Sequence, residues 1–562
     1  MDFEGISDIL GHSGKYQKYV FGLACIGAIF PGMVVVCMTF VGYPVKHRCV
    51  VSVCDDNNTH YEEKFVEWAI PEGEKCRVRE LENNITDQCK QDVFSNSTTH
   101  CSKWVYDNSL FSATTVSQFD LTCERTWLGP LAVSVYMAGM LIGAIVIGDF
   151  SDRFGRKKGM LLSALLIGTG GILSAVSPNY CMFLIMRFFT GAGGIGLFQI
   201  TFVQAIEFTG TKWRTFCGIF IEVPFAVGEA MAGVLAVFIR DWRWLQVAVS
   251  APAFILVTYI WLMPESFRWL VSQGRNDEAK KVLERAAKVN DVDIRIHLGD
   301  DDNMEVPSSA DTVLVSNIKE DLEKECQHEG TTMKSVIDLL TTPNMRIRSF
   351  NLFFCWSVIT LVYFGLSSNT SNLGGNVFVN FIASMLIEIP SCIFSYFALD
   401  RLGRKGSLSF VLLLGGFSCF ISGFIPEGYD WLVVCLSLVG KFGAAAGFAI
   451  VYVYSAELFP TDYRSVGVGA CSMCGRVGGI VSPLIASLAE VYKPLPLVIF
   501  GVLSAVSGCL VVFLPETVGC KLPQTLPESE AFGTDQSIWF FACVDKHQKK
   551  STRETNTTSR EV

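Results

Sequence analysis

The hexapeptide DRFGRK at residues 152–157 recurs as DRLGRK at residues 400–405, a shift of 248 residues (400 − 152). Two other motifs recur in the same order at nearly the same shift. They are Glu207 with Arg214, which return as Glu457 with Arg464, and PES at 264–266, which returns as PET at 515–517. Three ordered repeats at nearly one spacing predict a chain built from two halves of similar fold.

Apolar runs lie on both sides of each repeated motif. The chain has 562 residues, of which 50% are hydrophobic and only 18% are charged. Twelve runs are long enough to cross about 30 Å of hydrocarbon as a helix. They are Tyr19–Val41, Leu128–Phe150, Gly159–Val176, Cys181–Phe208, Thr215–Ile239, Trp244–Met263, Ile347–Ser367, Asn376–Leu399, Ser407–Ile425, Trp431–Leu458, Val466–Val491 and Leu495–Leu514. We therefore expect an all-α membrane protein with twelve transmembrane helices in two pseudo-symmetric six-helix halves.

The basic loops predict the orientation of these helices. Residues 152–158 and 401–405 are short and rich in Lys and Arg, which favours the cytoplasmic side. Both termini are then cytoplasmic. The expected segments are a cytoplasmic N-terminus (1–18), the first helix (19–41), an extracellular loop (42–127), helices 2–6 (128–263), a cytoplasmic loop with short helices (264–346), helices 7–12 (347–514) and a cytoplasmic tail (515–562).

The composition of the loop at 42–127 agrees with an extracellular position. It contains six cysteines, Cys49, Cys54, Cys76, Cys89, Cys101 and Cys123, and three glycosylation acceptors, Asn57, Asn84 and Asn96. An even cysteine number together with such acceptors predicts a disulfide-bonded, glycosylated cap. The sequence leaves the pairing of the cysteines open.

The repeated charges predict a gate on the cytoplasmic side. Asp and Arg side chains at helix ends can form charge-assisted bonds between neighbouring helices in one state of a transporter and release them in the other. The candidates are Asp152, Arg153, Arg156, Glu207 and Arg214 in the first half, and Asp400, Arg401, Arg404, Glu457 and Arg464 in the second. The alternative is that these charges only set the topology.

Several longer motifs resemble one transporter family. They include GDFSDRFGRKK at 148–158, PESFRWLVSQGR at 264–275, NLGGN at 372–376 and GKFGAAAGFAIVYVYSAELFPTDYRSVGVG at 440–469. Together they resemble the major facilitator superfamily and, within it, the organic cation, anion and zwitterion transporters of solute carrier family 22. The start of the chain is most similar to the carnitine and zwitterion branch. The resemblance implies alternating access by rocking of one half against the other around a central site.

Charged residues inside apolar runs are costly and are candidate binding residues. The resemblance implies that Arg476 holds a carboxylate, because anion and zwitterion transporters of the family carry Arg there, and that Glu388 faces a cation. Glu222 and Glu229 lie seven residues apart on one helix face and could attract a cation or be structural. Lys441 fits either a gating or ligand role or snorkelling to the membrane surface.

Aromatic residues complete the predicted site, since ring faces bind quaternary ammonium groups well. The resemblance places Trp356 and Tyr363 at the cavity, and Phe198 and Phe448 are symmetry mates at a shift of 250 residues (448 − 198). Acids, rings and an Arg together suit an organic zwitterion such as carnitine, and also organic cations. An organic anion exchanger and a cationic drug or polyamine carrier are the alternatives.

The remaining expectations concern coupling, partners and location. Sodium-coupled carnitine transporters of the family carry an Asn-Tyr pair where this chain has Leu197 and Phe198, so sodium coupling is doubtful. The 45 Lys and Arg against 54 Asp and Glu disfavour a nucleic-acid partner. No enzyme motif is present in a suitable setting, and no cofactor or metal is expected. We expect a monomeric transport unit in the plasma membrane, with the lipid bilayer and a small organic solute as its partners.

Overall fold

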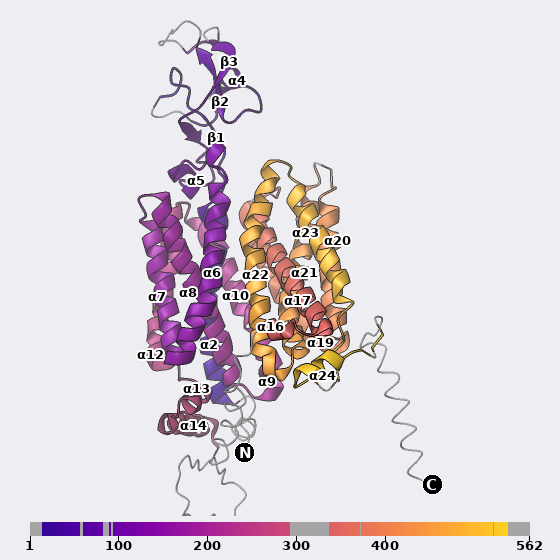
Figure 1. Ribbon diagram of the computed structural model, residues 1–562. Coiled ribbons are helices and arrows are strands. Elements are labelled where there is room, and N and C mark those ends of the chain that lie inside the picture. The colour runs from indigo at the N-terminus through magenta and orange to yellow at the C-terminus, as the bar shows by residue number, and fades with distance from the viewer. Residues whose placement is uncertain are drawn as a thin grey trace, which may run out of the picture.

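The computed structural model describes residues 14–56, 60–81, 89–91, 94–292, 336–370, 373–426, 428–520, 522–534 and 536–537. Within these ranges eleven helices are long and apolar enough to cross a membrane, and a shorter apolar helix spans Leu495–Val511. These twelve helices match the twelve predicted runs. Figure 1 shows them as two groups that stand side by side.

The first half contains six spans, some of them interrupted. Its elements are α2 (Lys15–Val35) continued by α3 (Met38–Val41), α6 (Leu128–Phe154), α7 (Arg156–Ala175), α8 (Tyr180–Glu207), α9 (Thr211–Phe220) continued by α10 (Glu222–Phe238), and α11 (Trp242–Ser250) continued by η4 (Ala251–Thr258) and α12 (Tyr259–Leu262). Glycines let these helices approach closely, as is common between membrane helices. A Cβ at Gly139 of α6 would lie 2.1 Å from the Phe188 carbonyl oxygen of α8.

The second half repeats this plan. Its elements are α17 (Pro343–Asn369), α18 (Val377–Leu386) continued by α19 (Glu388–Arg401), α20 (Arg404–Ser422), α21 (Asp430–Leu458), η6 (Thr461–Tyr463) continued by α22 (Arg464–Ala486) and η7 (Ser487–Glu490), and α23 (Leu495–Val511). A similar close helix contact at a glycine occurs where α17 meets α22, because a Cβ at Gly478 would lie 2.1 Å from the Ser357 carbonyl oxygen.

The repeated motifs build the same junction in each half. Gly155 (φ 107°) links α6 to α7, and the carboxylate of Glu265 accepts the backbone N–H of Arg156 at 2.8 Å. Gly403 (φ 83°) links α19 to α20, and Glu516 accepts the backbone N–H of Arg404 at 3.0 Å. In both halves the acid of the PES or PET motif therefore caps the start of the helix that follows the basic loop, which explains why the two motifs recur together. Burial raises the pKa of Glu265, and its backbone hydrogen bonds oppose that shift.

We call this end of the bundle the motif end. Short helices cover it: α13 (Phe267–Ser272), α14 (Asn276–Asn290), α16 (Val336–Leu339) and α24 (Leu526–Ala531). Short helices were expected in the connection between the halves. Glu530 of α24 accepts the backbone N–H of Asn344 at 2.9 Å, so the segment after the last span caps the start of α17.

The opposite end, which we call the loop end, carries a small cap that projects beyond the bundle (Figure 1). Its elements are β1 (His47–Cys49), α4 (Val66–Ala69), β2 (Arg77–Leu81), β3 (Phe94–His100), β4 (Trp104–Tyr106), α5 (Thr115–Gln118) and η3 (Cys123–Arg125). Strands β1 and β4 pair antiparallel, as do β2 and β3. A buried ion pair between Arg48 and Asp55 (2.8 Å) lies beside the small core around Cys49 and Val51.

Three disulfides join the cysteines of the cap. The pairs are Cys49–Cys101, Cys54–Cys89 and Cys76–Cys123. This confirms the expected oxidation and supplies the pairing that the sequence left open. His47 lies near the Cys76–Cys123 bond, but sulfurs joined in a disulfide do not offer thiolate ligands to a metal. Asn96 is exposed on β3, whereas Asn57 and Asn84 lie outside the described residues.

Candidate functional site

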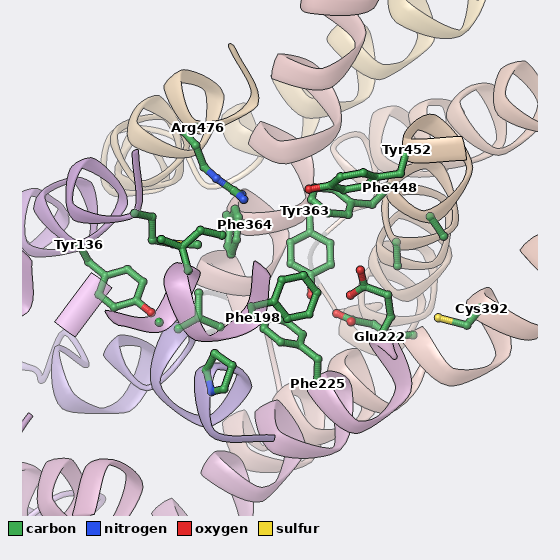
Figure 2. A pocket seen from close by; sticks show the side chains of 18 residues that line it. Tyr136, Phe198, Glu222, Phe225, Tyr363, Phe364, Cys392, Phe448, Tyr452 and Arg476 are labelled. Carbon is green, nitrogen blue, oxygen red and sulfur yellow. The ribbon is translucent and has the colours of Figure 1, made fainter. Parts of the chain in front are cut away.

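A cavity lies between the two halves. Helices α2, α6, α8 and α10 line it from the first half, and α17, α19, α21 and α22 from the second. Most of its wall is apolar or aromatic, and its charged lining residues are Glu222, Glu388 and Arg476. Figure 2 shows Arg476 and Glu222 approaching the cavity from different sides, with the rings of Tyr363 and Phe198 between them in this view.

Prolines fix the places of the two lining glutamates. Pro224 and Pro390 have no N–H to donate to the preceding turn, so the fifth and eighth spans are interrupted just before them. Glu222 and Glu388 are consequently the first residues of α10 and α19. Interrupted helices near the middle of a membrane protein often mark its binding site.

Arg476 comes from the middle of α22 and is 5% exposed. Its Nε is buried without a hydrogen-bond partner among the described residues. Among the described residues, no carboxylate lies within 4.0 Å of its guanidinium. The predicted residue therefore lines the cavity with a positive charge that no ion pair neutralises.

Glu388 differs from Arg476, because a lysine neutralises it. Lys441 of α21 places its Nζ 2.8 Å from Glu388 Oε1, and the two side chains are 1% and 6% exposed. The same Nζ donates to Ser367 Oγ at 2.7 Å and lies 3.3 Å from the centre of the Tyr363 ring. Glu388 thus lines the cavity as predicted, but its charge is engaged inside the protein. Lys441 is fully buried, so it does not snorkel to the membrane surface.

Glu222 and Glu229 have different environments despite sharing one helix. Glu222 lines the cavity, and no described cation lies within ion-pair distance of it. Glu229 lies two turns further along α10, is fully buried and does not line the cavity. The Tyr363 hydroxyl donates to its two oxygens at 3.3 and 3.2 Å. Of the two acids, Glu222 therefore lines the cavity, whereas Glu229 lies in the protein interior beyond it.

Aromatic rings form much of the cavity wall. Phe198 meets Phe225 edge to face at 5.1 Å between ring centres, and Phe448 lies 5.9 Å from Tyr363. Phe198, Tyr363 and Phe448 all line the cavity. Trp356 does not line it. Its Nε1 donates to Ser455 Oγ at 2.9 Å, and its ring packs 4.3 Å from that of Tyr452, so it supports the wall from behind.

Sequence reasoning missed several lining residues, namely Tyr136, Phe225, Phe364, Cys392 and Tyr452. Three of them follow predicted residues at helical spacing. Phe225 is three residues after Glu222, Cys392 is four after Glu388, and Tyr452 is four after Phe448. Residues at these spacings share a helix face. Including the residue one helical turn after each predicted residue would therefore have found these three.

The candidate gating residues lie at the motif end as two matching networks. Arg156 pairs with Asp152 and with Glu207 (3.3 Å). Arg404 pairs with Asp400 (3.7 Å) and Glu457 (3.0 Å). Each network joins the ends of three helices within one half.

The other candidate gating residues lie around these networks. Arg153 pairs with Asp149 at the surface, and Arg464 donates to Thr461. Arg214 lies in α9 and Arg401 ends α19. None of the ion pairs found among the described candidates connects the two halves.

A second cavity lies beside the first-half network. Asp152 and Arg156 line it, and it shares Phe198, Glu222 and Tyr452 with the central cavity. The charged motif is thus adjacent to the central site.

Comparisons with known proteins agree with this architecture. The proton:xylose symporter XylE bound to 6-bromo-6-deoxy-D-glucose superposes with a TM-score of 0.59 and 16% identity, covering 92% of this chain and 99% of its own. At that identity the likeness concerns the fold. Together with the two repeated six-helix halves, it shows that the chain has the major facilitator fold.

Sequence relatives place the chain more narrowly. Residues 84–525 match the family described as sugar (and other) transporter. An organic cation transporter protein of Drosophila melanogaster is 36% identical over 538 residues, 95% of either chain. The human organic cation/carnitine transporter 2 is 32% identical over 541 residues, 94% of either chain, and mouse solute carrier family 22 member 3 is 32% identical over 548 residues, 94% of this chain and 95% of its own. The chain belongs to the sugar (and other) transporter family, in its solute carrier family 22 branch of organic cation transporters. It is therefore a multi-pass membrane transporter and not an enzyme.

Proposed function

We propose that this protein moves small organic zwitterions such as carnitine, and also monovalent organic cations, by alternating access around the central cavity. One observation carries the proposal. The cavity presents one carboxylate, Glu222, and one guanidinium, Arg476, each without an ion-pair partner among the described residues. An ammonium group suits the first and a carboxylate suits the second, with bidentate geometry available from the guanidinium.

The aromatic wall supports the same substrate class. Phe198, Tyr363, Phe448 and Tyr452 surround the space that an ammonium near Glu222 would occupy. Ring faces attract a quaternary ammonium while making no demand for hydrogen bonds that it cannot form. A dianion gains nothing from these rings and is repelled by Glu222. A polyamine or another multivalent cation is repelled by Arg476, so both alternatives fit the cavity less well.

The location of the protein is part of the proposal. A cap with three disulfides is suited to an oxidising compartment, and the basic motif end is suited to the cytoplasm. We therefore place the loop end outside the cell, the motif end and both termini inside, and the protein in the plasma membrane. One chain supplies the entire wall of the cavity, so a monomer suffices as the transport unit.

The test is uptake by cells that express the protein. Radiolabelled L-carnitine, tetraethylammonium and a dicarboxylate are compared, each with sodium and with sodium replaced, against untransfected cells. The proposal predicts saturable uptake of carnitine and of the monovalent cation, with little uptake of the dianion. Because Leu197 is buried in the core and Phe198 offers no oxygen ligand, carnitine uptake should survive sodium removal. Uptake of the dianion alone would keep the fold and overturn the substrate class.

A further inference from the structure

The two halves meet at the loop end through aromatic rings. Phe40 comes from α3 of the first half, whereas Phe378 and Phe381 come from α18 of the second half. The Phe40 ring stacks on that of Phe378 at 5.6 Å between ring centres and meets that of Phe381 edge to face at 4.6 Å. Each of the three side chains is at most 5% exposed. The rings therefore form a buried contact between the halves.

A residue of the cap completes this contact. Phe111 lies in the segment between β4 and α5 and is 2% exposed. Its ring centre lies 6.4 Å from that of Phe40 and 5.7 Å from that of Phe378. The cap thus contacts the second half directly, although it is part of the loop that follows α3 in the first half. We call Phe40, Phe111, Phe378 and Phe381 the loop-end cluster.

Backbone hydrogen bonds fasten this segment of the cap to the first half. The Ser112 N–H donates to the Arg240 carbonyl oxygen at 3.1 Å, and the Trp242 N–H donates to the Ala113 carbonyl oxygen at 3.3 Å. Arg240 and Trp242 lie at the turn between α10 and α11. Figure 1 also shows the cap above the first-half helices. We therefore expect the cap and the first half to move as one body.

Arg240 connects the cap, the first half and the second half with one side chain. Its Nε donates to the Val237 carbonyl oxygen at 2.8 Å, and its Nη1 donates to the Leu110 carbonyl oxygen of the cap at 2.9 Å. These bonds hold the guanidinium over the Phe378 ring, 4.5 Å from its centre. A cation over a ring face is attracted by the ring electrostatically. This attraction acts only while Phe378 lies against the first half.

Other contacts between the halves close the same end. A Cβ at Gly233 of α10 would lie 2.8 Å from Phe381 Cδ1, so α10 and α18 are in close contact at this level. Ser134 of α6 donates its hydroxyl to the Ile480 carbonyl oxygen of α22 at 2.8 Å. Toward the motif end, by contrast, the second cavity continues from the central one. Opening of the loop end therefore requires that the loop-end cluster come apart.

We propose that the cap is part of the gate at the loop end. The loop-end cluster, with Arg240 held over Phe378, keeps this end closed and separates each time it opens. This inference rests on the proposed function, because it needs alternating access and a substrate that arrives at the loop end. The cap and α3 stay with the first half, whereas α18 moves away with the second. The contact of Phe111 with Phe40 then survives the cycle, and its contact with Phe378 breaks.

Cross-linking of the full-length protein in cells tests which contact must break. The first pair of substitutions is Phe111→Cys with Phe378→Cys, and the second pair is Phe111→Cys with Phe40→Cys. Both double variants and wild type are treated with a short bifunctional methanethiosulfonate. Mass spectrometry of the linked peptides measures cross-linking, and uptake of radiolabelled tetraethylammonium and L-carnitine is measured before and after treatment. Treated wild type accounts for reaction with the native cysteines.

The two pairs should respond differently. The first pair joins the halves, so its cross-link should lower uptake by roughly 10-fold or more, because the loop end can no longer open. The second pair joins the cap to its own half and is the matched control, which should keep its uptake. Where a cysteine pair lacks uptake before treatment, the kinetics of a single variant decide the question.

That variant is Arg240→Gln, which removes the charge over Phe378. A larger fraction of the carriers is then open at the loop end and able to bind substrate from that side. The KM for uptake should fall about 2- to 10-fold, since apparent affinity rises with the binding-competent fraction. Arg243→Gln is the matched control, because its guanidinium lies 5.1 Å from the centre of the Trp242 ring within the first half. Its KM should equal that of wild type.

The outcomes separate this inference from the proposed function. Uptake that is lost with the first cross-link and kept with the second, together with a lower KM in Arg240→Gln, supports it. Equal effects of the two cross-links overturn it and leave the proposed function standing, as do failure of the first cross-link to form and a KM in Arg240→Gln that is unchanged or raised. If wild type takes up neither solute, the proposed function is wrong, and the inference falls with it.

Discussion

At the scale of single residues, Glu222 supplies the unpaired negative charge of the cavity. Replacing it with Gln should raise the KM for carnitine and for tetraethylammonium by roughly 10-fold or more, because a charge-assisted contact contributes about 1.5–3 kcal/mol. Glu222→Asp should recover part of the loss, since it restores the charge at a slightly different position. Initial uptake rates at equal surface expression give the measurement, and an unchanged KM for both substrates would remove Glu222 from the site.

Some of the site residues were predictable from the sequence, and others were not. Arg476 and Glu222 were predictable as site candidates because charges are rare inside apolar runs. The pairing of Glu388 with Lys441 was not predictable, because it depends on which helices become neighbours. The position of Trp356 behind the cavity wall was missed for a related reason. A sequence pattern shows which helix face a residue lies on, but not which neighbouring side chains cover it. Here the rings of Phe448 and Tyr452 pack against Trp356.

At the scale of elements, the α6–α7 junction depends on a glycine. Gly155 has φ 107° and ψ 153°, a conformation that side chains disfavour, and a Cβ there would lie 2.6 Å from Glu265 Oε2. Gly155→Ala should therefore destabilise the protein by about 1–3 kcal/mol. Gly148→Ala is the matched control, since a Cβ at that helical position meets nothing within 4 Å.

Thermal unfolding of both variants in detergent measures this effect. Gly155→Ala should lower the Tm, whereas Gly148→Ala should leave it unchanged or raise it slightly through better helix propensity. Equal Tm values for the two variants would mean that the junction does not require glycine.

The ion pairs at the same junction bear on the transport cycle. Asp152→Asn removes one of the two carboxylates that hold Arg156, while Glu207 keeps its contact. We expect a lower Vmax with little change in KM, because the central cavity keeps its wall and only the motif end is altered. Asp149→Asn, which removes an exposed pair with Arg153, should have little effect. A variant Asp152→Asn that mainly raises KM would contradict a gating role.

The positions of the membrane helices were largely predictable from the sequence. The breaks within the fifth and eighth helices were not predicted, although prolines in the sequence mark them. The length and hydropathy of the runs place all twelve spans close to their helices. The breaks before Glu222 and Glu388 follow from Pro224 and Pro390, which leave a carbonyl without its helical donor. Reading each buried acid together with a proline two residues later would have indicated both the break and the site.

At the scale of the whole molecule, two similar halves enclose a site that neither forms alone. Arg476 comes from the second half and Glu222 from the first. A zwitterion bound to both charges would therefore bridge the halves, and its release would require them to separate on one side. The repeated motifs made this duplication predictable from sequence, whereas the disulfide pairing of the cap depends on three-dimensional proximity and was not.

The central claim is that Arg476 receives the carboxylate of a zwitterion. The most direct measurement is a double-mutant cycle between protein and substrate: uptake kinetics of L-carnitine and of its methyl ester by wild type and by Arg476→Ala, at matched surface expression. Wild type should prefer carnitine over the ester by roughly 10- to 100-fold in Vmax/KM, and Arg476→Ala should reduce this preference to about parity while still transporting the ester. An equal preference for carnitine in both proteins would show that Arg476 does not bind the carboxylate and would contradict the account.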